Sequence, residues 1–215
     1  MEYKLSKILP FYNKLRTSDK LALDRVSKKK IEKGTLIPRC SGVLCVLSGR
    51  LRVFIVNESG KEITLYRLFE GEACVLSGSC GIRNISFEVH VKAEVDTSLV
   101  TLSSSLYHNL EDKYPEVTVF SNTVMAARLS DVMWTLEQVA FSSMDRRVAS
   151  YLVEQRAMSQ CDDLIITHDE IARDLGTARE VVSRMLKYFQ NEGWIIQGRG
   201  KVLIKDYSAL YDLSA

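Results

Sequence analysis

The chain has 215 residues, of which 46% are hydrophobic and 26% charged, and 29 lysines and arginines against 27 aspartates and glutamates leave a net charge of +2. This composition excludes disordered, collagen-like and low-complexity classes. The longest apolar runs are far shorter than the roughly 20 residues of a membrane helix, and the N-terminus lacks the apolar core of a signal peptide, so we expect a cytoplasmic protein. Since there is no overall basic excess, any nucleic-acid surface must be local.

The first half of the chain predicts a small β-structure. Residues 4–26 have a weak helical pattern interrupted by Pro10, and residues 28–102 consist of short alternating apolar runs separated by turns. In RLRVFIVNESGKEITLYRL the alternation continues on both sides of residues 57–60, which is a hairpin signal. Turns at intervals of about 8 to 12 residues are typical of all-β sandwiches and barrels. We therefore expect a small antiparallel barrel here.

A short helix, SSLYHNLEDKY, and then a long helix are predicted after the barrel. Residues 116–141 follow Pro115 and contain neither glycine nor proline. A helix of about 26 residues spans about 39 Å, which is longer than a small barrel. A core helix packed on its own barrel remains an alternative, but we favour a homodimer through residues 116–141. Its apolar stripe has heptad spacing and consists of Met125, Leu129, Val132, Leu136 and Val139.

Residues 142–215 have the element order of a winged helix. The segments MDRRVASYLVEQRAM and LII precede two closely spaced helices, DEIARDL and REVVSRMLKYFQNEG, with Gly176 between them, as in a helix-turn-helix. Each of these two helices begins with a T-x-x-E capping box, Thr167 to Glu170 and Thr177 to Glu180. The run WIIQGRGKVLIK then predicts a hairpin, the wing, and residues 206–213 predict a last short helix.

Positive charge is concentrated where a winged helix meets DNA. Residues 142–177 carry four basic and seven acidic side chains, a net of −3, whereas residues 178–205 carry six and two, a net of +4. The N-terminal residues of a recognition helix reach base edges. Glu180 also fits the cap, and Arg184 also fits a phosphate contact or a pair with Glu180. The predicted DNA contacts are Arg179, Glu180 and Arg184 to bases, Ser183 on the same face as Arg179, and Thr167, Thr177, Arg199 and Lys201 to phosphates or as caps.

The whole chain resembles the Crp/Fnr transcription regulators, the catabolite activator family. The resemblance rests on ITHDEIARDLGTAREVVSRMLKYFQNEGWI, LSGRLRV and ITLYRLFEGE and covers essentially the full length. It implies an α+β fold with an N-terminal antiparallel β-roll (a cupin-like barrel, similar to cyclic-nucleotide-binding domains), a long dimerisation helix and a C-terminal winged helix-turn-helix. The implied boundaries are 1–112, 113–141 and 142–215.

The same resemblance implies a transcription regulator rather than an enzyme. In this family a homodimer binds a palindromic operator, and activators also contact RNA polymerase. The operator-contacting roles fall on Arg179, Glu180 and Arg184, while Ser183 is closer to the Fnr branch. Two half-sites are then expected about 10 bp apart, or a multiple of that distance.

The sensor half departs from the family members that bind cyclic AMP. Those members carry a second Gly-Glu for the ribose and an Arg-Ser pair for the cyclic phosphate, whereas Val75-Leu76 and Phe87-Glu88 stand at these places here. A phenylalanine and a carboxylate supply neither the donors nor the positive charge that a phosphate needs. The N-terminal cysteine cluster of Fnr is also missing, since residues 1–39 contain no cysteine. We expect an effector other than cyclic AMP.

Cysteines are the alternative candidates for sensing. Cys74 and Cys80, and more loosely Cys40, lie in or near the altered segment, and thiols suit haem, iron–sulfur clusters, other metals or reversible oxidation. The simpler interpretation is that each is a small buried hydrophobe, as we expect for Cys45, while Cys161 is unassigned. Five cysteines, an odd number, argue against a disulfide framework. A thiol-based redox enzyme or sensor using Cys74 or Cys80, and a constitutive regulator with a structural barrel, remain alternatives.

Overall fold

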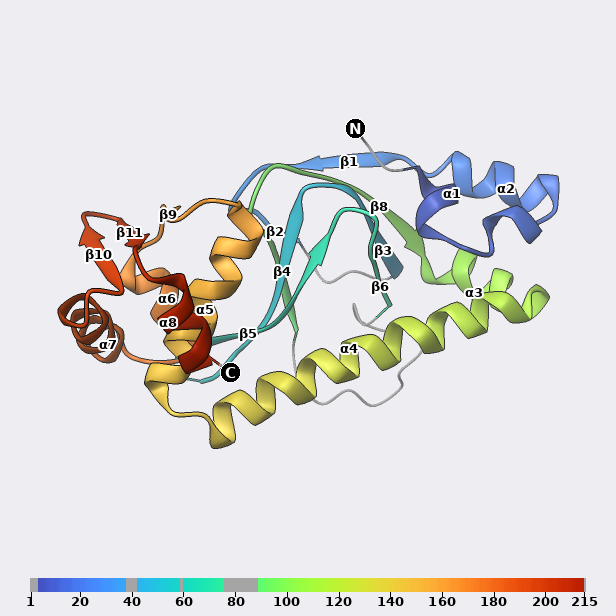
Figure 1. Cartoon of the computed structure of the whole chain (residues 1–215). Helices are drawn as coiled ribbons and strands as arrows, with labels where there is room; N and C mark the ends of the chain where they lie inside the picture. Colours follow the sequence, from blue (N-terminus) through green and yellow to red (C-terminus); the bar gives the residue numbers. More distant parts are fainter. Residues whose placement is uncertain (1–3, 38–41, 59, 76–88, 215) are drawn as a thin grey trace. The chain divides into compact units, whose positions relative to one another are not determined.

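The computed structural model describes residues 4–37, 42–58, 60–75 and 89–214 (Figure 1). The chain divides into two compact units, Met1–Val56 with Leu65–Met133, and Asn57–Thr64 with Trp134–Ala215. Each unit has a hydrophobic core of its own. Within the described ranges, no helix combines the length and the apolar character that crossing a membrane requires.

The first unit is a β-roll built from two four-stranded antiparallel sheets (Figure 1). The strand orders are β1-β8-β3-β6 and β2-β7-β4-β5, and the hairpin expected around residues 57–60 joins β4 to β5. The predicted β-roll is therefore confirmed. The strands are β1 Lys28–Ile31, β2 Leu36–Ile37, β3 Gly42–Ser48, β4 Arg50–Val56, β5 Glu62–Phe69, β6 Ala73–Cys74, β7 His90–Ala93 and β8 Thr97–Ser103.

Strand β3 is buried on both faces, which explains why VLCVL is a continuous apolar run. Leu44 and Val46 belong to the cluster that also contains Leu51 and Val91 of the other sheet, so this cluster fills the space between the sheets. The alternate residues of β3 belong to a second cluster, shared with the helices that cover the outer face of its sheet. One strand thus contributes to two cores because successive side chains point to opposite faces.

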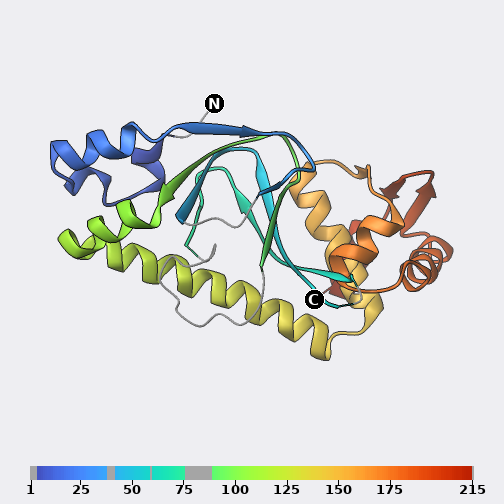
Figure 2. The same cartoon turned by 180° about the vertical axis from the view of Figure 1, so that it is seen from behind.

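Helices cover the outer face of the β3 sheet. The N-terminal segment forms α1 (Leu5–Ile8), a 3₁₀ turn (Tyr12–Lys14) and α2 (Thr17–Asp24), with Pro10 between the first two as expected. Helix α3 (Ser104–Lys113) lies beside them (Figure 2), and the Asp19 carboxylate of α2 accepts a hydrogen bond of 2.7 Å from the Tyr114 hydroxyl.

Helix α4 runs from Pro115 to Phe141, and its first residue is the proline whose fixed φ suits a first turn. The long helix is confirmed, but its heptad stripe is divided. Met125 and Val132 pack against the two clusters of the β-roll, whereas the other stripe residues face solvent. The exposed large apolar side chains of α4 are Val119, Leu129, Met133, Trp134, Leu136, Val139 and Phe141.

The second unit contains the predicted winged helix. Its three helices α5, α6 and α7 and a three-stranded sheet of order β10-β11-β9 surround one core, to which α8 also contributes. The hairpin β10–β11 is the wing. The bounds are α5 Met144–Ser159, β9 Asp163–Leu164, α6 His168–Leu175, α7 Arg179–Asn191, β10 Ile195–Gly198, β11 Lys201–Ile204 and α8 Tyr207–Ser214.

Candidate nucleic-acid interface

The first helix of the helix-turn-helix begins with the predicted capping box. The Thr167 hydroxyl accepts the backbone N–H of Glu170 at 3.2 Å, and the Glu170 carboxylate accepts the backbone N–H of Thr167 at 2.8 Å. Two amides that the helix leaves unpaired are satisfied in this way. Thr167 therefore acts as a cap, one of the two roles that the sequence left open for it.

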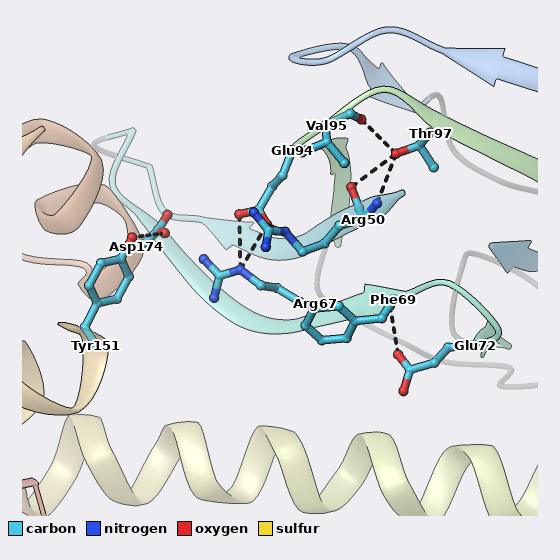
Figure 3. Close-up of polar contacts among 9 residues, drawn as sticks. All are labelled: Arg50, Arg67, Phe69, Glu72, Glu94, Val95, Thr97, Tyr151 and Asp174. Atoms are coloured by element: carbon cyan, nitrogen blue, oxygen red, sulfur yellow. Dashed lines mark hydrogen bonds and ion pairs between the residues drawn. The ribbon is translucent and has the colours of Figure 1, made fainter. Parts of the chain in front are cut away.

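The turn after α6 is fixed from two sides. Gly176 ends the helix at φ 63°, a left-handed conformation that glycine adopts without strain. Arg147 of α5, which is buried, donates from Nη2 to the Leu175 carbonyl at 2.5 Å, and burial lowers the pKa of its guanidinium. One helical turn further along α5, the Tyr151 hydroxyl donates to Asp174 at 2.9 Å (Figure 3). These contacts fix the direction in which α7 starts.

Helix α7 has one buried and one exposed side. Val182, Leu186 and Phe189 are fully buried, whereas Arg179, Glu180 and Arg184 are exposed and Ser183 is half-buried. We call these last four residues, which the sequence predicts to meet DNA, the DNA-contacting face. All four lie in the first two turns of α7, as the sequence predicts.

The capping box predicted for α7 is wrong. The helix starts at Arg179, its N-cap is Ala178, and no side chain caps it. Thr177 therefore lies one residue too early to be the N-cap of α7. Its backbone amide is bonded to the Ala172 carbonyl as part of the turn. Glu180 occupies the second helical position instead of the third, so its carboxylate does not return to the N-cap amide. The capping role that competed with base contact by Glu180 is thereby removed.

The start of α6 contacts the DNA-contacting face at two points. Arg179 Nη1 lies 3.3 Å from Asp169 Oδ2, and both side chains are largely exposed. Ser183 Oγ lies 2.9 Å from His168 Nδ1 in a partly buried hydrogen bond. Neither His168 nor Asp169 was a predicted site residue. Their position directly after a Thr N-cap was the available signal, since it places them beside the next helix.

The wing carries two of the predicted phosphate contacts. Arg199 is exposed at the β10–β11 turn, where Gly200 has a φ of 70°. Lys201 is also exposed, but its Nζ lies 3.2 Å from Asp163 Oδ2 of β9. A surface pair of this kind contributes little to stability.

The described cysteines of the β-roll are buried and separate. Cys45 and Cys74 have 0% and 2% of their surface exposed and belong to clusters on opposite faces of one sheet, so they do not form a disulfide with each other. Burial raises the pKa of the Cys45 thiol to about 12. Its predicted place in the core is confirmed. Cys40 and Cys80 lie outside the described residues.

Cys74 lies inside the β-roll and contacts a tyrosine hydroxyl. Its Sγ is 3.6 Å from the Tyr66 hydroxyl. Within residues 4–37, 42–58, 60–75 and 89–214, no group of three or more His, Cys, Asp or Glu side chains is arranged to hold a metal ion. Leu76 and the Phe87-Glu88 pair, on which the expectation of an effector other than cyclic AMP rests, also lie outside the described residues.

Two charged side chains of the first unit, Glu94 and Arg128, make polar contacts that the sequence did not predict. Glu94 accepts from Arg67 Nε at 3.1 Å with both carboxylate oxygens and lies 2.7 Å from Arg50 Nε (Figure 3). Arg128 is buried on α4, donates to Asp131 at 2.9 Å and lies over the Tyr66 ring at 5.0 Å. It is an arginine on the same helical face as two core-packed stripe residues, and this position was the signal for it.

Comparison with known proteins identifies the family. The model of the Crp-like helix-turn-helix domain matches residues 146–213. A crystal structure of a transcriptional regulator of the Crp/Fnr family from Eubacterium rectale is 43% identical, with a TM-score of 0.91, over 96% of this chain and 98% of that one.

Characterised relatives agree with this assignment. The cAMP-activated global transcriptional regulator Vfr of Pseudomonas aeruginosa is 25% identical over 205 residues, 89% of this chain and 94% of its own. The cyclic AMP receptor protein of Thermus thermophilus is 29% identical over 170 residues, 79% of this chain and 77% of its own. The chain belongs to the Crp/Fnr family of transcription regulators.

Proposed function

We propose that this regulator binds a palindromic DNA operator as a homodimer and contacts base edges with α7. The observation that carries the proposal is the DNA-contacting face: two arginines and a glutamate are exposed on the first two turns of a helix whose opposite side is fully buried. Arg179 and Arg184 suit guanine, and Glu180 suits the amino group of cytosine. Phosphates around it would be contacted by Thr177, Arg199 and Lys201, whereas the hydroxyl of Thr167 is used in the α6 cap.

The proposed dimer uses α4. Its exposed face carries seven large apolar side chains, more than scattered surface hydrophobics account for. A second copy of the same helix would cover those on the heptad stripe, Leu129, Leu136 and Val139, in a symmetric, self-complementary interface. The proposed division is then a sensor in residues 1–112, the dimer helix in 113–141 and the DNA-binding domain in 142–215. If the protein activates transcription, RNA polymerase is a further partner.

For the sensor we propose an effector other than cyclic AMP, although two relatives are named for that nucleotide. The support is the sequence: Val75-Leu76 and Phe87-Glu88 replace the polar pairs that would hold ribose and phosphate. A haem, iron–sulfur or other metal cofactor on the cysteines is the alternative to a small-molecule ligand. The absorption spectrum and metal content of anaerobically purified protein separate these, since a chromophore, a metal or neither gives a distinct result.

Selection from a pool of random duplexes at low salt tests the DNA-binding proposal. Wild-type protein should enrich an inverted repeat, and Arg184→Ala should weaken binding to it by about ten- to a hundredfold, the value of one good base contact. Arg25→Ala is the matched control, because Arg25 is an exposed arginine in the first unit. An equal loss of DNA affinity in both variants would mean that binding depends only on net positive charge. Failure of the wild type to enrich any inverted repeat would overturn the proposal.

A further inference from the structure

His168 is the first residue of α6, and its ring contacts the helix that follows. Its Nδ1 lies 2.9 Å from Ser183 Oγ, the hydroxyl of the fifth residue of α7. The capping box at this helix start uses Thr167 and Glu170, so it does not require the imidazole. His168 also lies outside the buried core of the second unit. The contact with Ser183 is therefore what this side chain does in the described structure.

Ser183 belongs to the part of α7 that would meet bases. It lies four residues after Arg179 and therefore on the same side of the helix, and it precedes the exposed Arg184. Arg179 is itself 3.3 Å from Asp169. Two consecutive residues of α6 thus contact two residues on one side of α7. The arginine pair is largely exposed and exchangeable, whereas the His168–Ser183 bond is partly buried.

The bond limits what the serine hydroxyl can offer to DNA. A hydroxyl has one hydrogen to donate and two lone pairs to accept with, and imidazole Nδ1 is either a donor or an acceptor. If Nδ1 accepts the serine hydrogen, Oγ can only accept, which suits the amino groups of adenine and cytosine. If Nδ1 carries a hydrogen, the serine hydrogen is released and suits the acceptors of guanine, adenine and thymine. An unpaired hydroxyl would rotate and serve both.

We propose that His168 is a specificity-determining positioning residue, which acts through its Nδ1–Oγ bond to fix the hydrogen-bonding direction of Ser183 toward one base of each half-site. The inference rests on the proposed function, because it requires that α7 contacts bases. Base recognition would then depend on a residue of α6 as well as on the residues of α7. It also predicts that the base contacts of this protein are not determined by the sequence of α7 alone.

Parallel selections from random duplexes test the proposal with wild type, His168→Asn, His168→Phe, Ser183→Ala and the double variant His168→Phe/Ser183→Ala. An asparagine amide lies where Nδ1 lies and keeps the bond, whereas phenylalanine removes it and keeps the ring. We expect His168→Phe to reduce base preference about three- to tenfold, the value of one hydrogen bond, at one position per half-site only. His168→Asn should retain the preference, and His168→Phe should add nothing once Ser183 is alanine.

The outcomes separate this inference from the proposed function. If wild type enriches no half-site, both are overturned. If wild type enriches one and His168→Phe leaves every position unchanged, or weakens all positions equally, His168 has a structural role at most and the inference alone is overturned. An effect of His168→Phe that persists without Ser183 also overturns it. If circular dichroism shows that His168→Phe is unfolded, His168→Gln replaces it. The glutamine amide lies where Nε2 of the imidazole lies, so it does not reach Ser183.

Discussion

Replacing Leu136 by glutamate tests the role of the exposed face of α4. Leu136 has 55% of its surface exposed, and full burial of a leucine is worth about 1.5 to 3 kcal/mol. Covering the exposed half in a dimer therefore contributes about 1 kcal/mol per copy, or about 2 kcal/mol for two copies related by symmetry. The loss of that amount weakens association about 30-fold. A carboxylate on each side of the interface adds a desolvation cost and repulsion, so 30-fold is the lower bound that we expect.

Sedimentation equilibrium measures the dissociation constant of the dimer directly. The matched control is Leu21→Glu on α2, since Leu21 is also a leucine with 50% of its surface exposed but lies outside α4. Wild type and Leu21→Glu should remain dimeric at concentrations at which Leu136→Glu is monomeric, with unchanged circular dichroism. Equal dissociation constants for all three proteins, or a monomeric wild type, would refute the reasoning that α4 forms the dimer.

Three further predictions concern a helix cap, an ion pair and the exposure of two cysteines. Thr167→Ala removes the cap of α6 and should lower the free energy of unfolding by about 1 kcal/mol, which corresponds to a melting temperature about 2 to 4 °C lower. The control Thr167→Ser keeps the hydroxyl and should melt like wild type. Equal melting temperatures for all three proteins would argue against the cap. Asp169→Asn frees Arg179 from its ion pair and should strengthen operator binding about two- to fivefold in fluorescence anisotropy at low salt, so weaker binding would contradict it. Iodoacetamide should alkylate the exposed Cys161 in the native protein, and peptide mass spectrometry detects the label. The buried Cys45, whose thiol pKa is raised to about 12, should react only after unfolding. Equal alkylation rates of the two thiols in the native protein would contradict that assignment.

Periodicity made most of the fold predictable. The switch from alternating to helical spacing near Ser103 coincides with the end of β8 and the start of α3, and the long helix begins at Pro115, one residue from its predicted start at 116. These features depend on local properties, namely the spacing of apolar residues and the position of proline. They do not require knowledge of which elements meet.

Tertiary packing accounts for what the sequence pattern could not predict. A heptad stripe specifies one side of a helix, but Met125 and Val132 of that stripe pack on the β-roll while Leu129 and Leu136 remain exposed. The two interpretations of α4, a core helix and a dimer helix, therefore apply to different residues of the same stripe. Periodicity alone does not state how many partners a helix has.

The candidate DNA interface shows the same limit at the scale of one residue. Thr167 and Thr177 each begin a T-x-x-E motif, but only Thr167 caps a helix. The turn after Gly176 uses the Thr177 amide to bond the Ala172 carbonyl, which delays the start of α7 by one residue. The Thr167 cap indicates that His168 lies near the next helix, but the His168–Ser183 bond itself could not be predicted, because the motif does not specify how the two helices cross.

The central claim is that a symmetric dimer contacts two half-sites with two copies of α7, and the spacing between the half-sites tests it most directly. The measurement is the affinity of wild-type protein for its selected operator and for the same operator with 5 bp inserted between the half-sites, about half a turn of DNA. The insertion moves one half-site to the opposite face of the duplex, so affinity should fall to the level of a single half-site. Equal affinity for the two duplexes would contradict the account.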